Sequence, residues 1–140
     1  MSVAAVLSPV FALVALVLFL AARMGATRVA AIKAGEVKLK DIALGQNSWT
    51  APVQQTSNAY ANNLQLPILF YALVAFAMLT GKDDLLFVIM SWLFAATRYG
   101  HAYVHVTSNF VPRRFQFFAA GVSVLGAMWI IFAARILLGL

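Results

Sequence analysis

The chain has 140 residues, of which 64% are hydrophobic and 10% are charged, and it contains no cysteine. A soluble domain is about half apolar, so this composition predicts an integral membrane protein and excludes disulfides, thiol nucleophiles and thiolate metal sites. The net charge of +6 comes from basic residues that gather between apolar segments, which favours a membrane topology over nucleic-acid binding.

Four apolar segments are each long enough to cross the hydrocarbon core of a bilayer, which is about 30 Å thick. We therefore expect an all-α fold in which residues 1–140 form a single membrane domain, a four-transmembrane-helix bundle. The expected spans are residues 3–34, 57–80, 84–107 and 113–139.

Basic residues gather in the loops on one side of this expected bundle. They are Arg23, Arg28, Lys33, Lys38 and Lys40 after the first span, and Arg113 and Arg114 at the start of the fourth. Because basic loops face the cytoplasm, both termini are expected on the non-cytoplasmic side. A secretory signal has its positive charge before the apolar core, whereas here the charge follows it, so the first span is expected to be retained. We expect a multi-pass protein of the bacterial inner membrane.

A loop is expected over residues 41–55, with Trp49 as an anchor at the membrane interface. The second span then opens with four carboxamides that lie within about 80° of one another on a helix. They are Gln55, Asn58, Asn62 and Gln65. This polar stripe has two interpretations: hydrogen bonds between helices, each worth about 0.6 kcal/mol, or the lining of a polar pocket.

The third span carries three polar residues at its cytoplasmic end. Arg98, His101 and His105 lie within about 80° of one another, so they share one helical face. An arginine at membrane depth costs about 2.5–3.5 kcal/mol on insertion scales, and it usually faces a partner or a wet cavity. This face lies at the depth of the polar stripe, so the two are expected to meet.

Several chemistries are disfavoured by what the chain contains. Bis-histidine haem ligation needs ligands on opposite faces of the macrocycle, which one helical face does not provide. No carboxylate or further histidine completes a zinc site around the two histidines. All four acidic residues lie in or beside loops, which disfavours proton-coupled transport. We therefore expect no haem, no metal and no nucleic acid.

What remains is a site lined by cations and amides near the cytoplasmic side. Its candidate residues are Lys38, Asn62, Gln65, Arg98, His101, His105 and Arg114. Such a lining suits an anionic, hydrogen-bonding small molecule that enters from the cytoplasm, while the membrane lipids supply a lipophilic co-substrate.

Four short motifs occur in order along the chain. They are GEVKLK after the first span, Asn62-x-x-Gln65 ahead of Pro67, Arg98-x-x-His101, and Pro112-x-Arg114. In their order, and in chain length and number of spans, the sequence resembles the MAPEG family (membrane-associated proteins in eicosanoid and glutathione metabolism), as a divergent bacterial-type member.

The resemblance implies a homotrimer that holds glutathione between neighbouring subunits near the cytoplasmic side. It implies a glutathione transferase or peroxidase that acts on lipophilic substrates. By position, Lys38, Asn62, Gln65 and His101 match glutathione-binding residues of the family, and Arg114 matches the arginine that holds and activates the thiolate. Arg98 and His105 join this binding set from the residue pattern described above.

The sequence departs from the family pattern at several of these places. Gln65 stands where the family has a carboxylate, and Asn58 and Ala61 stand where basic residues are common. His105 and Phe118 replace tyrosines. The alternative is therefore a non-catalytic lipid-binding protein, or an accessory or structural subunit of a larger membrane protein complex.

Overall fold

The computed structural model describes residues 1–43, 45 and 48–139. Within these residues all regular secondary structure is helical, which confirms the predicted all-α class. The helices are α1 (Val3–Lys33), α2 (Leu39–Ile42), α3 (Ala51–Thr80), α4 (Leu85–Val106) and α5 (Val111–Leu137).

Three helices in the described ranges, α1, α3 and α5, are long and apolar enough to cross a membrane. Large apolar side chains such as Leu18 and Ile130 remain exposed along them, as lipid-facing side chains do. The protein is therefore an integral membrane protein. The 22 residues of α4 are also enough for a core about 30 Å thick, at 1.5 Å per residue. Its C-terminal half is less apolar because it carries Arg98, His101 and His105.

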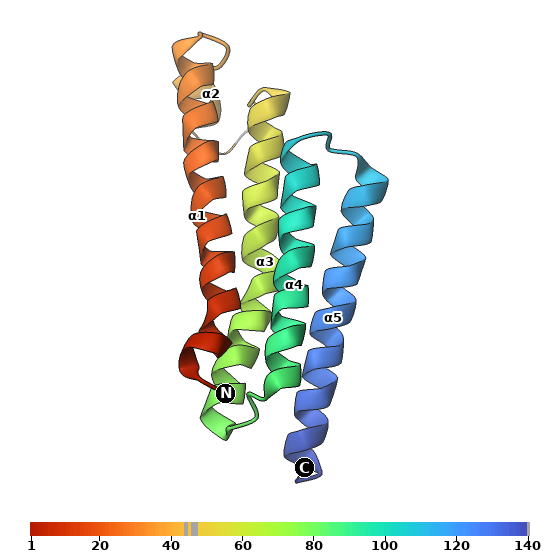
Figure 1. Ribbon diagram of the computed structural model, residues 1–140. Helices are drawn as coiled ribbons and strands as arrows, with labels where there is room; N and C mark the ends of the chain where they lie inside the picture. Colours follow the sequence, from red (N-terminus) through yellow and green to blue (C-terminus); the bar gives the residue numbers. More distant parts are fainter. Residues whose placement is uncertain (44, 46–47, 140) are drawn as a thin grey trace.

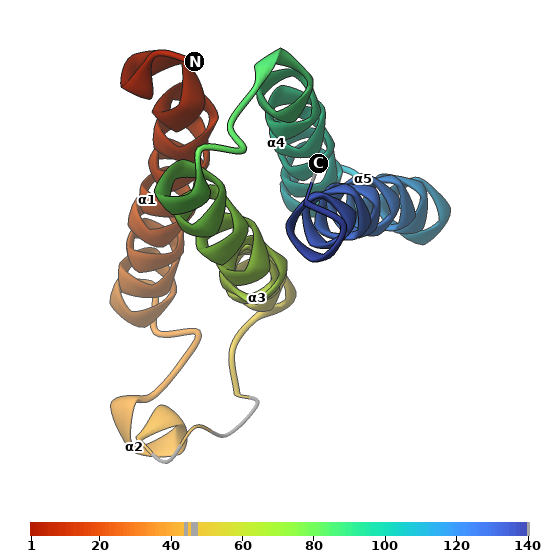
Figure 2. The ribbon, with the colours of Figure 1, turned by 90° about the horizontal axis from the view of Figure 1, so that it is seen from below.

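The four long helices run side by side, and the short α2 lies near the end of α1 that is opposite the N-terminus (Figure 1). In the view along the helices, α1 and α5 lie on opposite sides of the molecule, with α3 and α4 between them (Figure 2). α4 contacts α1, α3 and α5, and its contact with α5 is the most extensive. It is therefore the helix through which α5 is attached.

The start of α3 differs from the expectation. The helix begins at Ala51, with Pro52 in its first turn, where a missing N–H costs nothing. Part of the expected loop over residues 41–55 is therefore helical, and α2 occupies another part of it. This extension brings Gln55 into the helix, one turn after its start.

Trp49 was expected to be an interfacial anchor, and in the structure its ring stacks on an arginine. The guanidinium carbon of Arg28, on α1, lies 5.0 Å from the centre of the Trp49 ring. Arg28 Nη2 also donates a hydrogen bond to the hydroxyl oxygen of Ser57, on α3, at 3.2 Å. This basic residue therefore joins α1, α3 and the connection between them.

The apolar core fills the half of the bundle nearest the termini. Phe70 and Phe94 are both fully buried, and their rings stack with centroids 4.9 Å apart. Leu13 of α1 and Leu125 of α5 belong to the same buried cluster, so all four long helices contribute to it. The buried arginine and histidines of α4, Arg98, His101 and His105, follow this cluster along the helix.

α5 packs closely on α4 because glycines lie at their contact: Gly100 of α4 faces the Phe117 ring, and Gly121 of α5 faces Thr97. The buried residues of α5 are Gly121, Leu125 and Met128. A Cβ atom at Gly121 would lie 2.9 Å from the Thr97 hydroxyl oxygen and 3.9 Å from Cδ of Arg98. The absence of a side chain at this position therefore allows the two helices to approach beside the buried arginine.

Ion pairs fasten the end of the molecule where both termini lie. Asp84 caps α4 by accepting a hydrogen bond from the Phe87 N–H at 2.9 Å. Arg135 Nη2, from the last turn of α5, donates to Oδ2 of Asp84 at 2.6 Å. The Met1 ammonium lies 3.5 Å from the Asp83 carboxylate. These contacts bring the N-terminus and the last turn of α5 to the turn between α3 and α4.

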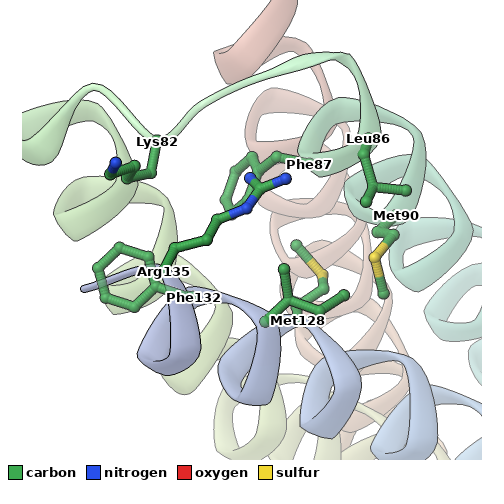
Figure 3. Close-up of a pocket in the computed structure, with 8 residues that line it drawn as sticks. Lys82, Leu86, Phe87, Met90, Met128, Phe132 and Arg135 are labelled. Carbon is green, nitrogen blue, oxygen red and sulfur yellow. The ribbon is translucent and has the colours of Figure 1, made fainter. Parts of the chain in front are cut away.

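Figure 3 shows Arg135 extending from α5 toward Phe87 at the start of α4. The pocket beside it has a volume of about 10 Å³, which is at the lower limit for a single water molecule. The pocket beside Arg135 is therefore too small for a ligand.

Replacing Gly121 with alanine should lower the free energy of unfolding by about 1–3 kcal/mol, because the new methyl group presses on Thr97. Gly126→Ala is a matched control on the same helix, since a Cβ there meets no atom within 4 Å. Unfolding in detergent, by heat or denaturant, measures both variants. Equal effects would contradict the tight approach at Gly121.

The pKa of Asp84 is lowered chiefly by its hydrogen bond from Arg135, and also by the Phe87 N–H. This carboxylate therefore stabilises the fold above its unfolded pKa, and that contribution is lost as pH falls through the lower folded pKa. Asp84→Asn keeps the helix cap but removes the charge, so it should cost about 0.2–1 kcal/mol at pH 7. The difference from the wild-type protein should vanish in strong acid, and a difference that persists there would exclude the ion pair as its cause.

Candidate functional site

One face of α4 buries three ionisable side chains. Arg98, His101 and His105 are 0%, 2% and 4% exposed, although arginine is almost never fully buried unless it is paired and histidine is only intermediate in burial. Their spacing of three and four residues places them in one row along the helix, as expected from the sequence. The row faces the interior of the molecule rather than its apolar surface.

Arg98 is held by two neighbouring asparagines of α3. Its Nη2 atom donates to Oδ1 of Asn62 at 2.5 Å and to Oδ1 of Asn63 at 3.3 Å. The backbone carbonyl of Asn62 accepts a further, longer hydrogen bond at 3.4 Å. Asn63 is itself fixed, because its Nδ2 donates to the Ala59 carbonyl at 2.9 Å. These neutral oxygens join α3 to α4 at the level of the buried charge.

The charge of Arg98 is nevertheless only partly compensated. Within the described part of the chain no carboxylate forms a salt bridge with it. Its Nε and Nη1 atoms are buried there without a hydrogen-bond partner. A buried cation with open donors is costly unless an acceptor reaches it. The interior beside α3 and α4 is therefore positively charged.

The two histidines form a perpendicular pair. Their ring centroids lie 5.4 Å apart, with an angle of 88° between the planes. Both Nδ1 atoms are buried without a partner among the described residues. Those residues include no group of three or more histidines, cysteines or acids placed to hold a metal ion. The pair therefore offers hydrogen bonds rather than a complete metal shell.

A pocket of about 250 Å³ opens beside this buried row. Asn62 of α3, His101 of α4 and Arg114 of α5 line it together with Val111, Phe115 and Phe118, and we call it the polar pocket. Arg114 is half-buried, and its Nη1 atom donates to Oδ1 of Asn109 at 2.6 Å. Arg98 does not line the pocket, but its hydrogen-bond partner Asn62 does. Arg114 is therefore the cation in the pocket lining, and Arg98 is a second cation behind Asn62.

Four of the seven predicted site residues do not line the polar pocket: Arg98, described above, and Lys38, Gln65 and His105. Lys38 precedes α2 and is exposed, in the segment between α1 and α3. Figure 2 shows α2 on the side of the molecule away from α5, which carries Arg114. Gln65 is exposed on α3. His105, although buried in the row of α4, also does not line the pocket.

The predicted stripe of carboxamides divides into two pairs. At 100° per residue, Gln55 and Asn62 lie about 20° apart, whereas Asn58 and Gln65 are rotated from them by about 60°. The first pair faces α4: Gln55 Nε2 donates to the carbonyls of His105 at 2.6 Å and Thr107 at 3.2 Å. The second pair is exposed. Hydrogen bonding between helices therefore accounts for Gln55, and Asn62 combines it with lining the pocket.

Asn63 and Asn109 are the polar residues near the site that sequence reasoning missed. Asn63 directly follows Asn62, so it points 100° away and falls outside the stripe. An asparagine in a largely apolar helix usually has a hydrogen-bond partner, so its presence could have indicated a buried polar contact. Asn109 lies in the connection between α4 and α5, and no periodic pattern in the sequence indicates the direction of its side chain.

Asn62→Ala should lower the free energy of unfolding by about 1.5–3 kcal/mol, because the buried guanidinium of Arg98 loses its shortest hydrogen bond. Asn58→Ala is the matched control, one turn earlier on the same helix and exposed, and should change it by less than about 0.5 kcal/mol. Chemical unfolding in detergent compares the two variants. Similar losses would show that Asn62 has no special part in holding Arg98.

Comparison with known proteins gives one match. The model of the MAPEG family matches residues 6–134, nearly the whole chain, including α3, α4 and the first turns of α5, which form the polar pocket. No curated protein and no solved structure matches this chain. Because the match extends over all four long helices, the chain belongs to the MAPEG family.

Proposed function

We propose that this membrane protein binds glutathione in the polar pocket and uses its thiol on lipophilic molecules from the bilayer, as a transferase or peroxidase. The observation that carries the proposal is the convergence of Asn62, His101 and Arg114, from three different helices, on one pocket. Amides and cations of this kind suit a small ligand with carboxylates and peptide groups.

The open donors of Arg98 support an anionic ligand. Nε and Nη1 are buried and lack an acceptor within the described residues, just behind Asn62. Glutathione has two carboxylates, and the uncompensated positive charge of Arg98 behind the pocket wall attracts an anion in the pocket. Its ammonium group has no carboxylate partner in the lining of the pocket, because the family's acid is Gln65 here and lies outside.

Arg114 is the proposed catalytic residue. A guanidinium beside a thiol lowers its pKa, and each unit corresponds to about 1.4 kcal/mol of preference for the thiolate. In a conjugation the thiolate forms a bond to an electrophilic carbon as the leaving group departs. In a peroxidase reaction two glutathiones are oxidised to the disulfide while a hydroperoxide is reduced to an alcohol and water.

The proposal includes a homotrimer with glutathione between subunits. The polar pocket, at about 250 Å³, is smaller than the range of about 300–1,000 Å³ that is usual for small-molecule sites. It also holds only part of the predicted binding set, since Lys38 and Gln65 lie outside it. A neighbouring copy that supplied its own exposed residues would complete the lining.

The membrane topology belongs to the same proposal. Both termini lie beside the turn at Asp83 and Asp84, whereas the basic residues Arg113 and Arg114 begin α5 at the opposite end. Under the positive-inside rule that opposite end, with the polar pocket, faces the cytoplasm of a bacterial inner membrane. α4 then crosses the bilayer together with α1, α3 and α5.

A non-catalytic lipid-binding or accessory role is the second candidate. A groove of about 320 Å³ between α1 and α4 favours it, because its lining is mostly apolar and faces outward. Leu16, Phe19 and Val106 line this groove, with Arg23 and Tyr103 among its few polar residues. An acyl chain suits such a surface, and binding it requires no thiol chemistry.

Arg114→Ala should lower kcat/KM for conjugation of glutathione to a generic aromatic electrophile by about 10²-fold, because the cation that stabilises the thiolate is lost. Arg113→Ala, which alters the preceding and exposed arginine, is the matched control and should leave the rate little changed. Initial rates on purified protein in detergent measure both. If the wild-type protein shows no rate above background and no glutathione-dependent thermal shift, the transferase proposal is wrong.

A further inference from the structure

Arg114 does not extend freely from the start of α5. Its Nη1 atom donates to Oδ1 of Asn109 at 2.6 Å, across the connection between α4 and α5. Arg113, the preceding residue on the same turn, is exposed, whereas Arg114 is half-buried at the polar pocket. A flexible arginine has many rotamers, so a fixed acceptor decides which of them it occupies.

The backbone of Asn109 is unusual. Among the described residues it is the only non-glycine residue with a positive φ, at 50°. Asparagine adopts this left-handed conformation more readily than most residues, because its short side chain forms local hydrogen bonds there. This conformation turns the chain at the end of α4 and directs the carboxamide of Asn109 to Arg114.

The connection itself is held on two sides. The Asn109 N–H donates to the Val104 carbonyl at 2.7 Å, which closes the last turn of α4. Gln55 of α3 holds the carbonyls of His105 and Thr107. Asn109 is therefore fixed to α4 by its own backbone, and α3 restrains the residues just before it.

We propose that Asn109 is a positioning residue that holds the Arg114 guanidinium at the polar pocket. The carboxamide binds Nη1 and leaves the other donors of Arg114 for the ligand. A neutral acceptor does this without cancelling the positive charge, which an aspartate at the same place would do. The identification of the ligand as glutathione rests on the proposed function, whereas the positioning of Arg114 rests on the contacts above.

The first test measures Arg114 without any ligand. Asn109→Gly keeps a backbone that accepts a positive φ but removes the acceptor, so phenylglyoxal should label Arg114 about 3- to 10-fold faster, as expected for the loss of an ordinary hydrogen bond at a half-buried position. Asn109→Asp restores an acceptor oxygen and should return labelling to the wild-type rate. Mass spectrometry measures the labelling rate of Arg114, with the labelling rate of Arg113 as the internal reference.

Ser108→Ala is the matched control for this labelling. It alters the adjacent residue of the same connection, whose hydroxyl oxygen accepts a hydrogen bond from the Phe110 N–H and not from Arg114. The Ser108→Ala protein should label at the wild-type rate. Labelling of Arg114 at the wild-type rate in Asn109→Gly would overturn the proposal.

The second test is a double-mutant cycle on glutathione affinity, measured by titration calorimetry. Asn109→Gly should weaken binding by about 3- to 10-fold in the wild-type protein and cause no further loss in Arg114→Ala. Asn109→Asp should also weaken binding, although Arg114 stays protected from labelling, because the carboxylate neutralises the cation. Independent losses in the cycle would mean that Asn109 does not act through Arg114. If the wild-type protein binds no glutathione, the proposed function fails, and the labelling rates alone decide the positioning role.

Discussion

The fully buried guanidinium of Arg98 constrains the half of the molecule that contains the polar pocket. Arg98 reaches two asparagine oxygens on α3, and within the described residues it has no salt bridge to a carboxylate. Neutral acceptors make the charge tolerable but do not cancel it. The contact that joins α3 to α4 therefore leaves a positive interior next to the polar pocket.

Features that depend only on local sequence patterns were predictable from the sequence. Apolar segments of membrane length gave the all-α class, and the order of short motifs gave the family. The row formed by Arg98, His101 and His105 was predictable as well, because the helical period alone places residues three and four apart on one face. No knowledge of neighbouring helices was needed for any of these.

Contacts that depend on the approach of a second element were not predictable. The carboxamide stripe of α3 divides because α4 lies nearer to Gln55 and Asn62 than to the other pair, and the sequence does not give that direction. Lys38 lies in a segment without a periodic pattern, so nothing in the sequence fixed its distance from α5. Asn109 was missed for a similar reason, since its role depends on one backbone angle in a connection.

The missing side chain of Gly121 has a consequence for the dimensions of the pocket. α5 carries Arg114 but is attached chiefly to α4, so the closeness of those two helices determines how far the arginine lies from His101 and Asn62. Because Gly121 has no side chain, α5 approaches α4 closely beside Arg98. A bulkier residue there would push α5 away from α4 and so move Arg114 away from His101 and Asn62.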